Sequence, residues 1–253
     1  MFALIEKYIV MKKHIPNFIT GLNAVSGCIA VYMAFNGELI LASLFIAIGA
    51  LFDFCDGMSA RLLSAYSEVG KEMDSLADVI SFGFAPSAIA YALLADIYDL
   101  ELMDLFLGDF SAAVLLVPFV MVMFSALRLA KFNIDTRQTT SFIGLPTPAN
   151  AILWASFPVI LKFGKMQYVK DMINNEWIII ILVFVMSFML IAEIPMFSFK
   201  LKSLKLKDNY TRYIFLVTII LLIASIGISA MVFLIPMYIV FSIVENLLKK
   251  RKA

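Results

Sequence analysis

Long apolar segments separated by short polar ones dominate the hydrophobic pattern of this chain. Segments of membrane-spanning length occur at residues 17–35, 39–63, 72–94, 110–132, 147–163 and 177–197. The apolar stretch 213–248 is too long for one helix, so we divide it near Gly227 into two short spans. The pattern therefore predicts an all-α integral membrane protein, a bundle of about eight transmembrane helices.

The N-terminal residues carry a different pattern from the spans. Residues 1–16 mix apolar positions with Lys7, Lys12 and Lys13, which predicts a short interfacial helix. A signal peptide fits less well, because the apolar run from Phe18 is longer than a typical signal core and no clear cleavage site follows it. We expect a single membrane domain over 1–253. It divides into the interfacial helix 1–16, a six-helix catalytic core 17–197, and a region 198–253 with a cytoplasmic loop, two spans and a basic tail.

Composition agrees with the pattern and excludes a soluble protein. Hydrophobic residues make up 62% of the 253 positions, charged residues make up 15%, and the mean hydropathy is +0.96. The formal net charge of +1 gives no sign of a nucleic-acid partner. Cys28 and Cys55 fall in two different predicted spans without metal-ligand spacing, so we interpret them as buried free thiols.

The distribution of positive charge predicts the orientation. With eight spans, all but three of the 20 Lys and Arg residues lie on the same side as both termini, and the exceptions are Lys162, Lys165 and Lys170. Because basic residues favour the cytoplasmic side, both termini are expected there, with membrane lipids around the bundle. The loop Asp96–Asp109, which carries acids and no base, is expected on the outer side.

Four carboxylates interrupt this apolar pattern: Asp53, Asp56, Asp74 and Asp78. A charged residue at the centre of a membrane helix costs roughly 2.5–3.5 kcal/mol on insertion scales, so these side chains need a cavity, a cation or one another. Helical spacing of about 100° per residue gives each segment one polar face. The first face holds Asp53, Asp56, Gly57, Ala60 and Arg61, and the second holds Gly70, Asp74, Asp78 and Ser81. A polar turn at 64–68 joins the two segments, so we expect all four carboxylates to converge.

Such a cluster favours a hard divalent cation. Carboxylate oxygens together with substrate phosphates are the usual ligands of Mg²⁺ and Mn²⁺. Gly57 and Ala60 leave space beside the carboxylates for a bulky ligand. A cation or proton transporter would also place carboxylates in the membrane, but it has no need of Gly57, Ala60, Arg61 and Gly70 at these spacings. In a purely structural cluster, only Arg61 and Lys71 are available to neutralise four acids.

The order of these residues, DxxDGxxAR followed by GxxxDxxxD, resembles the signature of the CDP-alcohol phosphotransferases, membrane enzymes of phospholipid synthesis. Every fixed position of the signature is present. The resemblance implies two metal ions, Mg²⁺ or Mn²⁺, held by the four aspartates, with Asp78 as the catalytic base. It also implies a homodimer and a set of CDP contacts: Asn17, Thr20, Gly57, Ala60, Arg61, Ser67 and Gly70.

A second stretch, RLAKFN at 128–133 with GLPTPAN at 144–150, is similar to the membrane-type phosphatidylserine synthases. That similarity implies transfer of the phosphatidyl group from CDP-diacylglycerol to L-serine, with release of CMP. Because serine carries a carboxylate, Arg128 and Lys131, with Asn133, are our candidates for binding it. The same cations would suit glycerol 3-phosphate or inositol phosphate, and an archaeal-type ether lipid donor is also open. From charge alone, the stretch could simply be a positive cytoplasmic loop.

Overall fold

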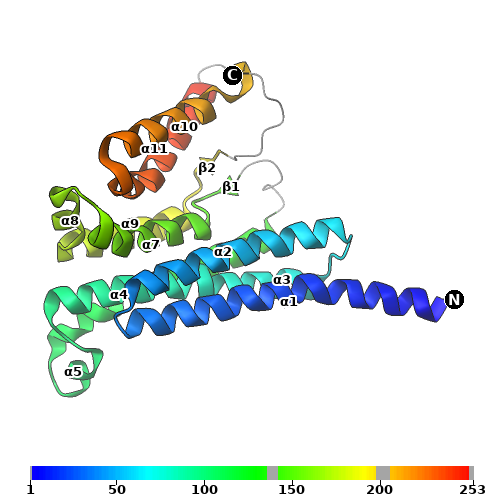
Figure 1. Cartoon of the computed structure of the whole chain (residues 1–253), viewed down its shortest axis with the longest axis horizontal. Helices are drawn as coiled ribbons and strands as arrows, with labels where there is room; N and C mark the ends of the chain where they lie inside the picture. The colour runs from blue at the N-terminus through cyan, green and yellow to red at the C-terminus, as the bar shows by residue number, and fades with distance from the viewer. Residues whose placement is uncertain (1, 136–141, 198–205, 251–253) are drawn as a thin grey trace.

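Helices account for nearly all of the described structure. The computed structural model describes residues 2–135, 142–197 and 206–250 (Figure 1). The helices are α1 (Phe2–Phe35), α2 (Leu39–Leu62), α3 (Glu68–Asp78), the π-helix η1 (Val79–Phe84), α4 (Ala85–Tyr98), α5 (Leu102–Phe106), the 3-10 helix η2 (Phe110–Phe119), α6 (Val120–Ile134), α7 (Thr147–Phe163), α8 (Gln167–Ile173), α9 (Glu176–Ile191), α10 (Leu206–Ile226), the 3-10 helix η3 (Gly227–Ala230) and α11 (Met231–Lys250). Two short strands, β1 (Phe142–Ile143) and β2 (Pro195–Met196), complete the described fold.

Among the described residues, five helical segments are long and apolar enough to cross a membrane. A sixth is added if the bent pair α8 and α9 forms one span, with a bend of 70° between them. One of the five, Asn209–Leu248, contains the break predicted near Gly227. That glycine has φ +63° and begins η3, and α10 and α11 fold back on each other as a hairpin (Figure 1). The all-helical membrane fold is therefore confirmed, whereas length and composition do not establish eight spans.

No helix break marks the predicted boundary at residue 16, and the division into an interfacial helix and a first span stays a prediction. The chain continues through it as the single helix α1, with Pro16 inside the helix. A proline inside a helix removes one backbone hydrogen bond and its ring crowds the preceding turn, but membrane helices tolerate this because neighbouring groups satisfy the freed carbonyl. The segment that qualifies as a span begins at His14.

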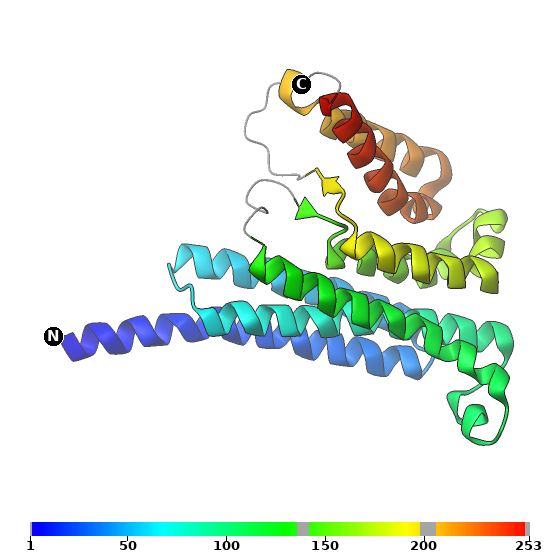
Figure 2. The same cartoon turned by 180° about the vertical axis from the view of Figure 1, so that it is seen from behind.

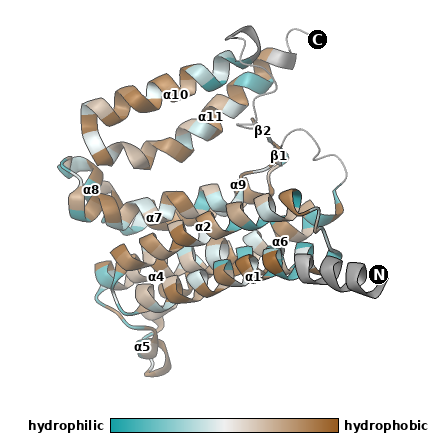
Figure 3. Ribbon diagram, turned by 45° about the vertical axis from the view of Figure 1, so that its right-hand side comes forward, coloured by the Kyte–Doolittle hydropathy of each residue, from teal (hydrophilic) through white to brown (hydrophobic). Residues whose placement is uncertain are grey.

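The helices pack in layers that bring distant segments to one end of the bundle. The helices α1 and α2 lie side by side, the continuous run α3–η1–α4 packs on both, and α6 covers α3 and η1 on the face seen in Figure 2. The helix α11 packs on α7. Figure 3 shows both termini and the strands at one end of the bundle and α5 and α8 at the other, with apolar residues covering most of the helices.

Several basic residues that set the predicted orientation lie outside the described residues: Arg137, Lys200, Lys202, Lys205, Arg251 and Lys252.

The two strands form a small antiparallel ribbon next to the ends of α6, α7 and α9. Phe142 pairs with Met196, and Ile143 pairs with Pro195. Beyond the ribbon, the Gly144 amide donates to the Ile194 carbonyl at 3.0 Å and the Leu145 amide donates to the Met189 carbonyl at 2.8 Å. These bonds tie the chain entering α7 to the chain leaving α9.

Candidate active site

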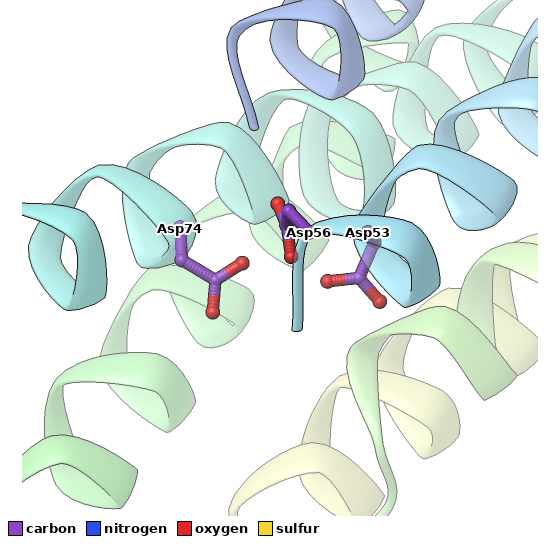
Figure 4. Close-up of side chains that lie close together, drawn as sticks. All are labelled: Asp53, Asp56 and Asp74. Atoms are coloured by element: carbon purple, nitrogen blue, oxygen red, sulfur yellow. The ribbon is translucent and has the colours of Figure 1, made fainter. Parts of the chain in front are cut away.

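Three of the four predicted carboxylates converge where α2 faces α3. Figure 4 shows Asp53 and Asp56, from α2, and Asp74, from α3, directed toward one another. One oxygen atom from each lies within 4.8 Å of the other two. The prediction that these two polar faces meet is confirmed for these three residues.

A tight turn between α2 and α3 makes this convergence possible. Ser64 adopts a left-handed conformation with φ +50°, and the Ala65 amide donates to the Ala60 carbonyl at 2.9 Å. Ser67 then caps α3, because its hydroxyl accepts a hydrogen bond of 3.0 Å from the Gly70 amide. The chain reverses within a few residues, so the polar end of α2 lies beside the polar start of α3.

The surroundings of the three carboxylates fit a bound cation. Asp56 Oδ2 and Asp74 Oδ1 are buried and have no hydrogen-bond partner among the described residues. The nearby cations point elsewhere, since Arg61 Nε donates to the Gly57 carbonyl at 2.9 Å and Lys71 Nζ donates to the Asn133 carbonyl at 2.9 Å. Clustered carboxylates with unsatisfied buried oxygens match the oxygen ligands that Mg²⁺ and Mn²⁺ take. A salt-bridged structural cluster does not match this geometry.

Asp78 lies apart from the other three, which corrects the prediction of a single point of convergence. It follows Asp74 by one helical turn, a rise of roughly 6 Å along the helix. Its side chain is buried, accepts a hydrogen bond of 3.2 Å from Asn23 Nδ2, and interacts electrostatically with Asp53, Asp74 and Arg128. The π-helix η1 begins directly after it. Asp78 therefore lies close enough to interact with both the carboxylate cluster and Arg128.

A pocket of about 200 Å³ opens beside Asp56 and Asp74. Six of the seven residues predicted to contact CDP line it: Asn17, Thr20, Gly57, Ala60, Ser67 and Gly70. Arg61, the seventh, does not line the pocket and is exposed. Sequence reasoning missed Ala65, Tyr66 and Lys71 as lining residues. Ala65 and Tyr66 lie in the turn between α2 and α3, and their position in that turn could have indicated that they line the pocket.

The two signature glycines in this pocket have different surroundings. A Cβ atom at Gly57 would meet only Arg61 Nη2, at 4.0 Å, so Gly57 faces open space. A Cβ atom at Gly70 would lie 2.9 Å from both Asn17 Oδ1 and Ser67 Oγ. A side chain at position 70 would therefore displace the Asn17 or Ser67 side chain, whereas Gly57 enlarges the pocket.

Asn23 is a site residue that the sequence reasoning missed. It is fully buried on α1, its amide nitrogen bonds Asp78, and its Oδ1 has no hydrogen-bond partner among the described residues. Pro16, Thr20 and Asn23 follow helical spacing along one face of α1, and this periodicity could have identified it. Thr20 is also buried, and its hydroxyl donates to the Pro16 carbonyl at 3.0 Å.

Arg128 and Lys131 line a second, smaller pocket of about 40 Å³, together with Phe132, Asp135, Ile143, Leu190, Ile191 and Glu193. The Arg128 side chain is buried, and its Nη1 donates to Thr147 Oγ1 at 3.2 Å. Its Nε has no hydrogen-bond partner among the described residues. A buried guanidinium with one unsatisfied N–H is suited to binding a carboxylate or phosphate.

Asn133 does not belong to this second pocket, contrary to the prediction. Its Nδ2 donates to Ser75 Oγ at 3.0 Å and to Glu72 Oε2 at 3.4 Å, so the side chain faces α3. At about 100° per residue, position 133 lies roughly 140° around α6 from Arg128, which turns it away from the pocket. Asn133 therefore joins α6 to α3 and does not line the arginine pocket.

Comparison with known proteins agrees with this site. The profile of the CDP-alcohol phosphatidyltransferase family matches residues 13–244. A Helicobacter pylori protein named CDP-diacylglycerol–serine O-phosphatidyltransferase is 29% identical over 91% of this chain and 90% of its own length. A Bacillus subtilis protein of the same name is 36% identical over 60% of this chain and 81% of its own. An archaetidylserine synthase of Methanothermobacter thermautotrophicus is 34% identical over 56% of this chain and 57% of its own. The chain therefore belongs to the CDP-alcohol phosphatidyltransferase family.

Proposed function

We propose that this protein transfers the phosphatidyl group of CDP-diacylglycerol to the hydroxyl of L-serine, giving phosphatidylserine and CMP. The observation that carries the proposal is the cluster of Asp53, Asp56 and Asp74, two of which line a pocket together with six predicted CDP-contact residues. Family membership and the names of the bacterial relatives support the reaction and the alcohol.

Asp53, Asp56 and Asp74 would hold Mg²⁺ or Mn²⁺, and Asp78 would help to hold a second ion. When bound, such ions neutralise the charge of the diphosphate and of its transition state. The unsatisfied oxygens of Asp56 and Asp74 support this assignment, because they leave buried negative charge without a protein partner.

The pocket beside the cluster would bind the CDP part of the donor. Gly57 and Ala60 leave space for it, and Asn17 and Ser67 offer polar atoms at its wall. Lys71 also lines the pocket, and its ammonium group would have to leave the Asn133 carbonyl before it could contact the diphosphate. Arg61 would have to leave the Gly57 carbonyl before its guanidinium could contact a phosphate.

Asp78 would act as the general base. In the proposed step it takes the proton from the serine hydroxyl while the serine oxygen bonds to the phosphorus of the phosphatidyl group. The bond from that phosphorus to the oxygen of the CMP phosphate breaks, and CMP leaves with the electron pair. The Asn23 amide would hold the Asp78 carboxylate in place, as their hydrogen bond indicates.

Arg128 and Lys131 would bind the serine carboxylate. Arg128 is buried beside Thr147 and interacts electrostatically with Asp78, which supports a position for serine between the base and the guanidinium. Glycerol 3-phosphate or inositol phosphate would need the same cations for its phosphate, so the choice of alcohol needs a direct test.

We further propose eight spans with both termini and the site on the cytoplasmic side. The helices α7 and α9 have 17 and 16 residues and would cross as short spans, and the α10–α11 hairpin would supply two more. The position of both termini at one end of the bundle supports an even number of crossings (Figure 3). The homodimer implied by the family resemblance stays a prediction, which the mass of the purified protein–detergent complex would test.

The decisive experiment measures CMP release by purified protein supplied with CDP-diacylglycerol and Mn²⁺. Parallel reactions contain L-serine, glycerol 3-phosphate, inositol phosphate or no alcohol. We expect release to depend on L-serine. Release only with another alcohol would overturn the serine assignment and keep the family chemistry. If folded protein released no CMP with any alcohol, the transferase proposal would fail and the transporter alternative would need testing.

A second candidate concerns the lipid donor. The similarity to the archaetidylserine synthase favours testing a CDP-linked ether lipid beside the diacyl donor. A higher kcat/KM with the ether lipid would reassign the donor without changing the proposed roles of the aspartates.

A further inference from the structure

One face of α11 is bonded to the backbone around β2. Tyr238, Ser242 and Asn246 are spaced by four residues, so they lie on the same side of the helix. Tyr238 Oη donates to the Phe197 carbonyl at 2.8 Å, and Ser242 Oγ accepts from the Phe197 amide at 3.4 Å. Asn246 Nδ2 donates to the Pro195 carbonyl at 2.5 Å. Three consecutive turns of α11 are thus hydrogen-bonded to the backbone of Pro195, the first residue of β2, and of Phe197, the residue after β2.

This ribbon forms part of the wall of the Arg128 pocket. Ile143 of β1 lines the pocket, and so do Leu190, Ile191 and Glu193, which precede β2 in the chain. Thr147, the partner of Arg128, begins α7 a few residues after β1. Any shift of β2 would therefore move β1 and the residues around the guanidinium.

The ribbon is short, and among the described residues its backbone hydrogen bonds continue toward α7 and α9, through Gly144 and Leu145. Each strand has two residues, and within the described part of the chain the register pairs Phe142 with Met196 and Ile143 with Pro195. Short two-stranded units are marginal without further partners, and unsatisfied backbone groups at membrane depth are costly. The α11 side chains satisfy Phe197 and Pro195, and Tyr238 also packs edge-on against the Phe197 ring at 4.8 Å between ring centroids. The side chains of α11 thus supply hydrogen bonds to the backbone at β2, as a neighbouring strand would.

We propose that the α10–α11 hairpin sets the geometry of the alcohol-binding pocket, with Tyr238, Ser242 and Asn246 as positioning residues that act through β2. This inference rests on the proposed function, because it assumes that Arg128 binds the alcohol substrate. It assigns a role to the C-terminal region beyond anchoring the chain in the membrane.

The test compares two conservative variants with matched controls on the same hairpin. Tyr238→Phe removes the hydroxyl and keeps the ring, and Ser242→Ala removes the acceptor for the Phe197 amide. The controls are Tyr210→Phe and Ser225→Ala, at exposed positions of α10. Ser225 is a close match, because Ser225 Oγ donates to the Leu222 carbonyl much as Ser242 Oγ donates to the Tyr238 carbonyl within its own helix.

We expect the KM for L-serine to rise about two- to tenfold in Tyr238→Phe and in Ser242→Ala, the usual range for a lost hydrogen bond. The KM for CDP-diacylglycerol and kcat should stay within twofold of the unmodified protein, and both controls should match it throughout. Unchanged serine KM, or a lower melting temperature without a change in KM, would overturn the positioning role.

Failure of the proposed function gives a different result. If the unmodified protein uses another alcohol, the serine assignment fails, and the KM for that alcohol in the same variants decides the positioning role. If no alcohol supports CMP release, both proposals fail, because the pocket then has no alcohol to bind.

Discussion

Asp78 differs from the other three acidic residues in what surrounds it. The oxygens of Asp53, Asp56 and Asp74 gather within 4.8 Å, while Asp78 is held by Asn23 one turn further along α3. It also interacts with both the cluster and Arg128. At the scale of single residues, this arrangement suits Asp78 to proton transfer, beside its proposed share in holding a second ion.

Replacing Asp78 with Asn tests that distinction. Asn keeps the size of the side chain and removes its capacity to accept a proton, so turnover should fall by about 100-fold or more, the usual contribution of a general base. Binding of CDP-diacylglycerol, measured by equilibrium dialysis, should stay within a few-fold of the unmodified protein. Asp96→Asn, at an exposed position of α4, serves as the control. Turnover near the normal rate in Asp78→Asn would remove Asp78 as the base.

Gly57 permits a second test at the residue scale. Because its Cβ would point into open space, Gly57→Ala should fold normally and gain up to about 1 kcal/mol of helix propensity. The added methyl group should narrow the pocket and raise the KM for CDP-diacylglycerol several-fold. Gly21→Ala is the matched control, since its Cβ would make an ordinary contact with Met73 at 3.6 Å outside the pocket. An unchanged KM in Gly57→Ala would show that no ligand comes close to this position.

At the scale of elements, the turn between α2 and α3 brings the carboxylates together. Each helix alone carries a polar stripe in an apolar segment. The left-handed Ser64 and the Ser67 cap reverse the chain so that the two stripes face each other. The resulting excess of negative charge between α2 and α3 is the physical reason to expect a divalent cation there.

Chelation tests this expectation. EDTA should abolish CMP release, and added Mn²⁺ or Mg²⁺ should restore it, because the diphosphate charge is otherwise unbalanced. The melting temperature should also rise with added Mn²⁺, as it does for any ligand that binds the folded state. Asp74→Asn should weaken both responses. Full activity in EDTA, together with a melting temperature insensitive to metal, would contradict the assignment of the three aspartates.

At the scale of the whole molecule, the bundle gathers every candidate site residue at one end. The first pocket is formed by α1, α2 and α3, and the second by α6, β1 and the chain around the end of α9. Both termini lie at this same end (Figure 3). The positive-inside distribution of Lys and Arg would place that end in the cytoplasm, where CMP could leave.

Cysteine labelling in intact cells checks the orientation. In a background without Cys28 and Cys55, a membrane-impermeant maleimide should label Lys165→Cys, which lies between α7 and α8 at the opposite end. The same reagent should not label Ala253→Cys until the membrane is permeabilised. The reverse pattern would invert the proposed topology, and labelling of both positions from outside would contradict the three crossings proposed between them, by α9, α10 and α11.

The sequence by itself determined the class of fold and the chemistry of the cluster. Hydropathy identified most helices within a few residues, including α7 and the break at Gly227, because a lipid environment requires long apolar helices. The spacing of Asp53, Asp56 and Asp74 predicted their convergence, since helical periodicity is local information. The continuation of α1 through Pro16 was not predicted, because local propensity at a proline favours a helix boundary.

Only the tertiary structure decided how these parts are related in space. It separated Asp78 from the other three carboxylates, bonded it to Asn23, and turned Asn133 toward α3 and away from Arg128. It also joined α11 to β2, two segments about 45 residues apart in the chain. Periodicity gives the face of one helix on which a residue lies, whereas the partner of that face depends on how whole helices pack.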